Sequence, residues 1–156
     1  MIIQSEGKIS KKINVFGPFD RFNYGDLLFP LVLEYCFNNY EPYLERKYYG
    51  TFSFNLLKRG GLKGDGFRAL RKDVNKEKRA VVLVAGGESI AATWHDLYSF
   101  KSKIYGWLCS FKLFNKILRH TELVRRLMNA RSNFPFQVCE EDYSSDLSVV
   151  FNSVGC

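Results

Sequence analysis

The apolar run at residues 81–85 constrains the fold of this chain more than any other segment. All five residues are apolar, three of them are β-branched, and two glycines follow directly. An uninterrupted run of this kind is typical of a central strand in a parallel sheet, where helices cover both faces. The sequence therefore predicts an α/β fold with a Rossmann-like, open and mostly parallel sheet and helices on both faces.

Other segments supply the remaining elements of such a sheet. Their patterns place strands at 13–16 and 147–151, and a weaker segment at 42–49 that is an edge strand or irregular. A helix is expected at 27–38 with Asp26 as its cap, and one or two amphipathic helices over 94–130 with lysine and arginine on the outer face. Between them lie a basic glycine-rich loop at 58–66 and a short polar helix or turn at 67–78. Residues 1–12 are interpreted as an N-terminal extension and residues 13–156 as a single domain. The last strand ends in a turn where a doubly wound sheet would continue with a helix. We therefore expect a fragment, or a natural truncation, of a longer protein in which a C-terminal lobe follows.

Charge is distributed unevenly along the chain. The net charge is +7, and the excess lies in residues 58–79 and 101–131, whereas residues 1–57 are neutral. Such segments are solvated faces, or they attract an anionic ligand, nucleic acid or membrane headgroups. Because no nucleic-acid-binding motif accompanies them, nucleic acid is not expected as a partner. The alternative to an enzyme is a basic module that binds nucleic acid or a membrane surface without catalysis.

Cysteine and histidine are too sparse to indicate a metal site. No two of the four cysteines have the spacing of a ligand pair, and neither histidine lies near such a pair. The sequence has no apolar leader and no run long enough to span a bilayer, so we expect a cytoplasmic protein with reduced thiols. In residues 101–131, Trp107 and Phe111 alternate with lysines. This pattern is also consistent with peripheral association of the protein with anionic lipid at the inner face of the membrane.

The polar loop after the first strand holds one group of candidate site residues. Ligands of open α/β sheets collect at the carboxyl ends of strands, where loops lead into helix N-termini. Arg21 can meet a phosphate or carboxylate, and Asn23 can hold the loop or a sugar hydroxyl. Gly25 is expected at a positive-φ turn, and Asp26 at the cap of the following helix. A hydroxylated ligand suits this loop, because Asp26 would oppose an anion.

The loop after the central strand holds the second group. Gly86 and Gly87 leave backbone amides free to face a ligand. Glu88 can act as a general base, accept hydrogen bonds, or simply occupy the first turn of the next helix. His95 is a further candidate, although adjacent residues on a helix point about 100° apart, so it forms no dyad with Asp96. The two loops are expected to open side by side onto one crevice.

Three short motifs occur in order, each after a predicted strand: Phe22-Asn23-Tyr24-Gly25-Asp26, Gly86-Gly87-Glu88 and Asn152-Ser153-Val154-Gly155. Together with the apolar strands before them, they resemble the N-terminal half of the polysaccharide pyruvyl transferase family. The resemblance runs from residue 13 to the end of the chain.

This resemblance implies the N-terminal lobe of a two-lobed enzyme built like the GT-B glycosyltransferases. It implies transfer of a pyruvyl group from phosphoenolpyruvate, without a cofactor, onto two hydroxyls of a cell-surface glycan. Asp26 and Glu88 are the expected catalytic residues, and Asn23, Gly25, Gly86 and Gly87 the expected substrate contacts, to which Arg21 and His95 are added from their own chemistry. Most phosphoenolpyruvate-binding groups are expected in the C-terminal lobe, so this chain alone should be inactive and bind phosphoenolpyruvate poorly.

Overall fold

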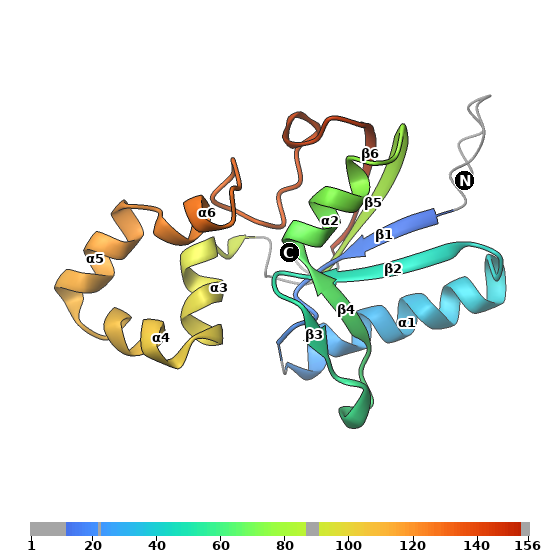
Figure 1. Cartoon of the computed structure of the whole chain (residues 1–156). Coiled ribbons are helices and arrows are strands. Elements are labelled where there is room, and N and C mark those ends of the chain that lie inside the picture. The colour runs from blue at the N-terminus through green and yellow to red at the C-terminus, as the bar shows by residue number, and fades with distance from the viewer. Residues whose placement is uncertain (1–11, 22, 87–90, 154–156) are drawn as a thin grey trace.

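The computed structural model describes residues 12–21, 23–86 and 91–153, arranged as in Figure 1. The strands are β1 (Lys12–Phe16), β2 (Glu45–Gly50), β3 (Phe54–Asn55), β4 (Lys63–Gly66), β5 (Arg79–Gly86) and β6 (Asp146–Ser153). The α-helices are α1 (Tyr24–Tyr40), α2 (Phe67–Val74), α3 (Trp94–Lys101), α4 (Lys103–Cys109), α5 (Lys112–His120) and α6 (Leu123–Leu127). Short 3-10 helices lie at Leu57–Arg59 and Glu140–Asp142.

The strands form one sheet in the order β3-β4-β2-β1-β5-β6. Every neighbouring pair is parallel except β3 with β4. The parallel strands follow the order of a doubly wound fold, in which the first strand is central and the chain then crosses to its other side. This confirms the predicted α/β class and mostly parallel sheet. β1 and β5 are neighbours at the switch point, where the strand order reverses.

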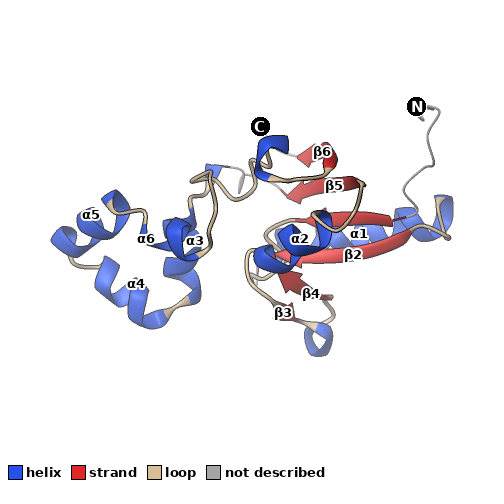
Figure 2. Cartoon of the chain, turned by 45° about the horizontal axis from the view of Figure 1, so that its top comes forward, coloured by secondary structure: helices blue, strands red, loops and turns tan. Residues whose placement is uncertain are grey.

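Helices cover both faces of the sheet, as predicted. On one face, Val15 of β1 and Leu83 of β5 belong to a core cluster that packs with Leu33 of α1. On the other face, Phe16 and Val84 belong to a cluster that includes side chains of α2 and of the helices after β5. Figure 2 shows α1 and α2 on opposite sides of the strands. Alternate residues of the strands therefore face alternate layers, as the two-residue period of a strand requires.

The helices α3–α6 form an arm beyond the carboxyl ends of the strands (Figure 1). Within it, α3 contacts α4 and α6, and α4 contacts α5. The prediction of one or two long amphipathic helices was wrong, because the chain turns at Ser102, at Phe111 and at Glu122. Only part of the apolar pattern is used for the core, to which Trp94 and Leu97 contribute.

The beginning of α1 also differs from the prediction. Asn23 is the N-cap, and its side-chain oxygen accepts a hydrogen bond from the Gly25 N–H at 3.2 Å. Asp26 is therefore the third helical residue rather than the cap. At this position its negative charge still interacts favourably with the helix dipole. Gly25 lies inside the helix and has no positive φ, so the predicted turn there was wrong. Pro30 lies inside the helix, in its second turn.

Two smaller predictions need correction. The strand expected at 42–49 is β2, which lies between β4 and β1 and not at an edge of the sheet. The segment expected to be a loop at 58–66 contains most of a 3-10 helix and all of β4. Both errors arise from residue composition. The charged residues of β2 and the glycines of β4 have low strand propensity, and these segments form strands because they pair with neighbouring strands in the sheet.

The loop that follows β1 lies in close contact with the last residues of β5. A Cβ atom at Gly17 would lie 2.1 Å from the carbonyl oxygen of Ala85. A Cβ atom at Gly86 would lie 2.7 Å from Cδ of Pro18. Both distances are shorter than real Cβ contacts, so glycine is required on both sides of this contact, at Gly17 in the loop and at Gly86 in the strand.

We expect Gly17→Ala to lower the free energy of unfolding by about 1–3 kcal/mol, because the added methyl group must displace the backbone of β5. Gly25→Ala is the matched control, since the nearest atom to its Cβ position is Oδ1 of Asn23 at 3.8 Å. Alanine also favours a helix over glycine, so this variant should be at least as stable as the wild type. Urea denaturation measures both, and equal stability of Gly17→Ala and the wild type would contradict the close contact between the loop and β5.

Candidate functional site

A cavity of about 330 Å³ lies between the sheet and the arm, at the carboxyl ends of β1 and β2. The loop between β1 and α1 lines one side, the residue after β2 lines another, and α3 closes it. The lining residues are Asp20, Arg21, Asn23, Thr51, Leu97, Phe100 and Lys101. This cavity, called the crevice below, lies where ligands bind in open α/β sheets.

Thr51 brings an unpartnered hydroxyl to the crevice. The residue is 2% exposed, and its Oγ1 atom makes no hydrogen bond to the described protein. Its backbone N–H is engaged, since it donates to Oδ1 of Asp20 at 3.4 Å. Buried hydroxyls in proteins nearly always have a partner. A polar ligand in the crevice would supply the one that Thr51 lacks.

Arg21 and Lys101 give the crevice positive charge. Nη2 of Arg21 is buried and, within the part of the chain that the structure describes, has no hydrogen-bond partner. Lys101 extends from the last turn of α3, and its Nζ atom lies 5.9 Å from the centre of the Phe52 ring. The N-terminus of α1, capped by Asn23, adds backbone N–H groups and the positive end of a helix dipole. These features together suit a ligand with a phosphate or carboxylate group.

Two carboxyl groups lie near Arg21. Burial raises the pKa of Asp20, although hydrogen bonds from the Phe52 and Thr51 N–H groups and the charge of Arg21 oppose this effect. Burial also raises the pKa of Asp26, and the charge of Arg21 partly offsets it. Asp26 is 6% exposed and does not line the crevice. Its pKa is nevertheless shifted in the direction that a proton-accepting carboxylate requires.

The structure brings only part of the predicted site together. Arg21 and Asn23 line the crevice. Gly25 is exposed in the first turn of α1, and Gly86, the last residue of β5, packs against Pro18. Gly87 and Glu88 lie outside the described residues. The loop after β1 contacts the end of β5 through Gly17 and Pro18, whereas the expectation that the two loops open side by side stays a prediction, because the loop after β5 lies in the same undescribed segment.

His95 is not brought to the crevice. It is 9% exposed within the arm, with Nδ1 2.9 Å from the Tyr105 hydroxyl and Nε2 2.8 Å from Oδ1 of Asn115. Both ring nitrogens are therefore engaged in linking α3 to α4 and α5. Sγ of Cys109 lies 3.9 Å from Nε2, but burial raises the pKa of this thiol, which keeps it protonated and disfavours a role as a nucleophile.

A second cavity of about 440 Å³ adjoins the crevice, and Thr51 lines both. Its walls come from the ends of β2 and β4, the start of α2, and the helices α3 and α6. The Phe52 and Tyr98 rings, whose centres are 5.7 Å apart, contribute an aromatic side. A ligand longer than one sugar could extend from the crevice into this cavity.

Sequence reasoning missed Thr51 and Lys101. The end of the strand predicted at 42–49 pointed to the loop that contains Thr51, because residues after parallel strands gather at one edge of the sheet. No comparable signal marked Lys101, which is one of several lysines in the basic segment after residue 100. Its place depends on how α3 packs over the sheet.

Comparisons with protein-family models, with curated proteins and with solved structures found no match for this chain. Among the described residues, histidine, cysteine, aspartate and glutamate do not gather in threes as metal ligands would. In the same residues, no helix combines the length and the apolar character needed to cross a bilayer.

Replacing Thr51 tests whether its hydroxyl contributes to the stability of the fold. Thr51→Val keeps the shape of the side chain and removes a hydroxyl without a partner, so we expect a melting temperature equal to or above that of the wild type. Thr93→Val is the contrasting variant, because Oγ1 of Thr93 accepts a hydrogen bond from the Asp96 N–H at 3.2 Å at the start of α3. Loss of this cap should cost about 1 kcal/mol. Thermal unfolding followed by circular dichroism measures both; a large loss of stability in Thr51→Val would show that its hydroxyl is bonded within the protein.

Proposed function

We propose that this chain is the N-terminal lobe of an enzyme like the polysaccharide pyruvyl transferases, and that its crevice binds an anionic sugar as the acceptor. The observation that carries the proposal is a pair of buried polar groups, the Thr51 hydroxyl and Nη2 of Arg21, in a cavity beside the switch point; neither has a hydrogen-bond partner among the described residues. The Rossmann-like strand order and the three motifs that resemble the family support it.

The residues of the crevice divide into two kinds that suit such an acceptor. Arg21 and Lys101 would bind its phosphate or carboxylate, since a guanidinium can form paired hydrogen bonds to either group. Asn23 and Thr51 would bind its hydroxyls. This combination revises the expectation that the loop after β1 favours an uncharged ligand, because Arg21 offsets the charge of Asp26.

The reaction requires a base near the acceptor. In pyruvyl transfer, two acceptor oxygens bond to C2 of phosphoenolpyruvate, C3 gains a proton to become a methyl group, and phosphate leaves with the other hydroxyl proton. The acceptor hydroxyls thus give up two protons. Asp26 is the first candidate, because its carboxyl is buried near Arg21 with a raised pKa, but it is not among the residues that line the crevice and would have to act from behind them. Glu88, from the loop after β5, is the second candidate.

Binding to this chain can be measured directly by calorimetry with glucose 1-phosphate, with uncharged glucose as the comparison. We expect glucose 1-phosphate to bind at least about tenfold more tightly, because hydrogen bonds to a charged group contribute about 1.5–3 kcal/mol. Arg21→Ala and Thr51→Val should each weaken its binding. Lys101→Ala should weaken it as well. Lys103→Ala removes the same charge from a residue that does not line the crevice, and should leave the affinity unchanged.

Two results would overturn this part of the proposal. One is equal affinity for the charged and uncharged sugar. The other is an equal loss of affinity in Lys101→Ala and Lys103→Ala, which would indicate nonspecific attraction to a basic surface.

Catalysis is tested in a protein that contains this chain together with the expected C-terminal lobe. We expect Asp26→Ala and Glu88→Ala each to lower the rate of phosphate release from phosphoenolpyruvate by about 10²–10⁴-fold, the usual contribution of a general base. Asp65→Ala is the control, because its carboxylate pairs with Lys47 at the protein surface. Wild-type rates in both site variants would refute the catalytic assignment, while leaving the binding result untouched.

A further inference from the structure

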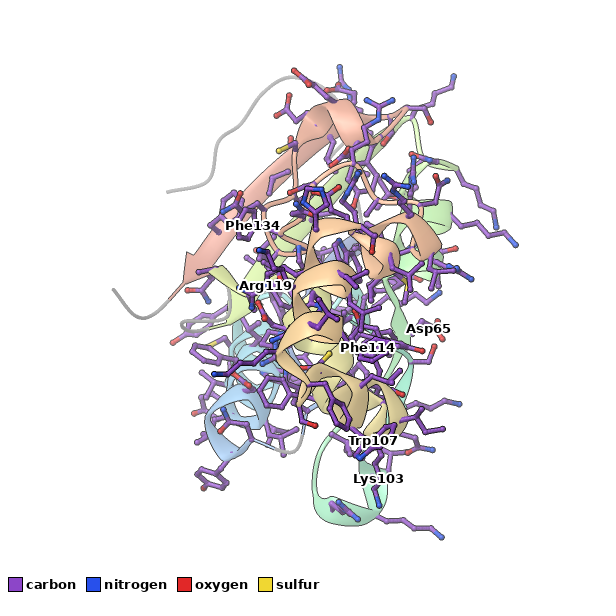
Figure 3. The ribbon with its side chains drawn as sticks, turned by 90° about the vertical axis from the view of Figure 1, so that its left-hand side faces the viewer. Asp65, Lys103, Trp107, Phe114, Arg119 and Phe134 are labelled. Atoms are coloured by element: carbon purple, nitrogen blue, oxygen red, sulfur yellow. The ribbon has the colours of Figure 1, made fainter. Side chains whose placement is uncertain are left out.

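The outer side of the arm exposes a continuous group of large apolar side chains. Trp107 is 63% exposed, and its ring centre lies 5.1 Å from that of Phe111, which in turn lies 6.3 Å from that of Phe114. Neighbouring aliphatic side chains of α4 and α5 are 48–76% exposed. The aromatic patch is defined as Ile104, Trp107, Phe111, Leu113, Phe114 and Ile117. Figure 3 looks at the molecule from the side of the arm and shows Trp107 and Phe114 on the surface turned to the viewer.

This patch is separate from the hydrophobic core of the arm. The arm has its own buried side chains, which include Leu97, Tyr105 and Val124 and join the main core. The residues of the patch recur at helical spacing along α4 and α5 but on the side away from those contacts. An amphipathic helix packed on the sheet would bury such a stripe. Here the stripe is left without a partner within the described structure.

Exposed basic side chains lie on the same helices as the patch. Residues 101–131 contain eight lysines and arginines and a single acidic residue. Among the described residues, Arg119 pairs with Asp96 and Arg125 with Glu122, whereas no ion pair there includes the lysines of α4 and α5. Those lysines are Lys103, Lys112 and Lys116. The helices α4 and α5 therefore carry exposed rings and aliphatic groups together with exposed lysines that form no ion pair within the described residues.

We propose that the aromatic patch docks the protein on the surface of an anionic lipid bilayer. The apolar side chains would enter the boundary between headgroups and acyl chains, and the lysines would contact lipid phosphates. Helices that lie in this boundary combine a tryptophan- and phenylalanine-bearing apolar face with a lysine-rich polar face. Each lysine near an anionic surface adds to the attraction.

The composition of the patch favours a membrane over a protein partner. Protein interfaces are enriched in aromatic residues but depleted in lysine. A second copy of the chain would bring its own uncompensated lysines against these, and like charges repel. A lipid surface, in contrast, offers negative charge at its rim and an apolar interior, which matches both features at once.

The test uses vesicles of phosphatidylcholine alone and vesicles with an equal share of phosphatidylglycerol, and the full chain. We expect sedimentation with the anionic vesicles and at least about tenfold weaker binding to the neutral ones. The chain has two tryptophans, of which Trp94 is 1% exposed and Trp107 is 63% exposed. A blue shift of the tryptophan emission on vesicle addition should therefore come from Trp107 and disappear in Trp107→Phe.

Paired variants identify the surface that binds. Leu113→Ser with Phe114→Ser, and separately Lys112→Glu with Lys116→Glu, should each weaken vesicle binding at least about tenfold. The apolar control is Val32→Ser with Tyr35→Ser, which removes side chains that are 52% and 70% exposed from α1, a helix in the neutral part of the chain. The charge control is Lys72→Glu with Lys76→Glu, at exposed positions in α2 and just after it. Both controls should bind like the wild type.

Three results would overturn the proposal. They are an absence of binding to anionic vesicles, equal losses in the patch and control variants, and sedimentation of the lipid-free chain as a dimer that the patch variants abolish. The last result would assign the patch to a second copy. Because these measurements use neither a sugar nor phosphoenolpyruvate, they are independent of the crevice and its proposed function.

Discussion

The architecture of this chain depends on the close contact between the loop that leaves β1 and the end of β5. Gly17 lies against the carbonyl of Ala85, and Gly86 lies against Pro18. The parallel strands β1 and β5 end at the same edge of the sheet, and this contact fixes the loop after β1 at that edge. The loop leads into α1, and the arm follows β5 along the chain. The crevice lies between this loop, the residue after β2 and α3.

The position of the arm is set by polar contacts at its base and by packing. Trp94, the first residue of α3, is buried, and its indole N–H donates to the carbonyl oxygen of Ser132 at 3.1 Å. The guanidinium groups of Arg68 and Arg71 on α2 donate to backbone carbonyls at the end of α6 and just beyond it. These bonds tie the arm to the layer that covers the sheet. They hold α3 where its last turn can close the crevice.

The elements that were predictable from sequence are those whose pattern is local. The strands at 13–16, 81–85 and 147–151 are confirmed, because apolar runs between turn residues leave few alternatives. The start of α1 was misplaced, since both Asn23 and Asp26 are good caps and only geometry decides which side chain reaches a free N–H. The division of the arm into four helices and the position of Lys101 in the crevice could not be predicted from the sequence. Periodicity reveals that a helix has an apolar stripe but not what covers that stripe.

The arm presents two different surfaces because its chain direction changes at one residue. Ser102 ends α3 and caps α4, with its own φ and ψ in the extended region. Lys101, before it, lines the crevice, whereas Lys103, after it, belongs to the basic margin of the aromatic patch. Two lysines separated by one residue thus serve opposite sides of the same structure. In an uninterrupted helix, residues 101 and 103 would point about 200° apart, but the helix axis would not change direction. The bend at Ser102 changes the direction of the axis as well. As a result, α3 keeps its contact with the core while α4 and α5 turn their apolar stripe away from the sheet. The fold can therefore close a polar cavity on one side of the arm and leave an apolar, positively charged surface on the other.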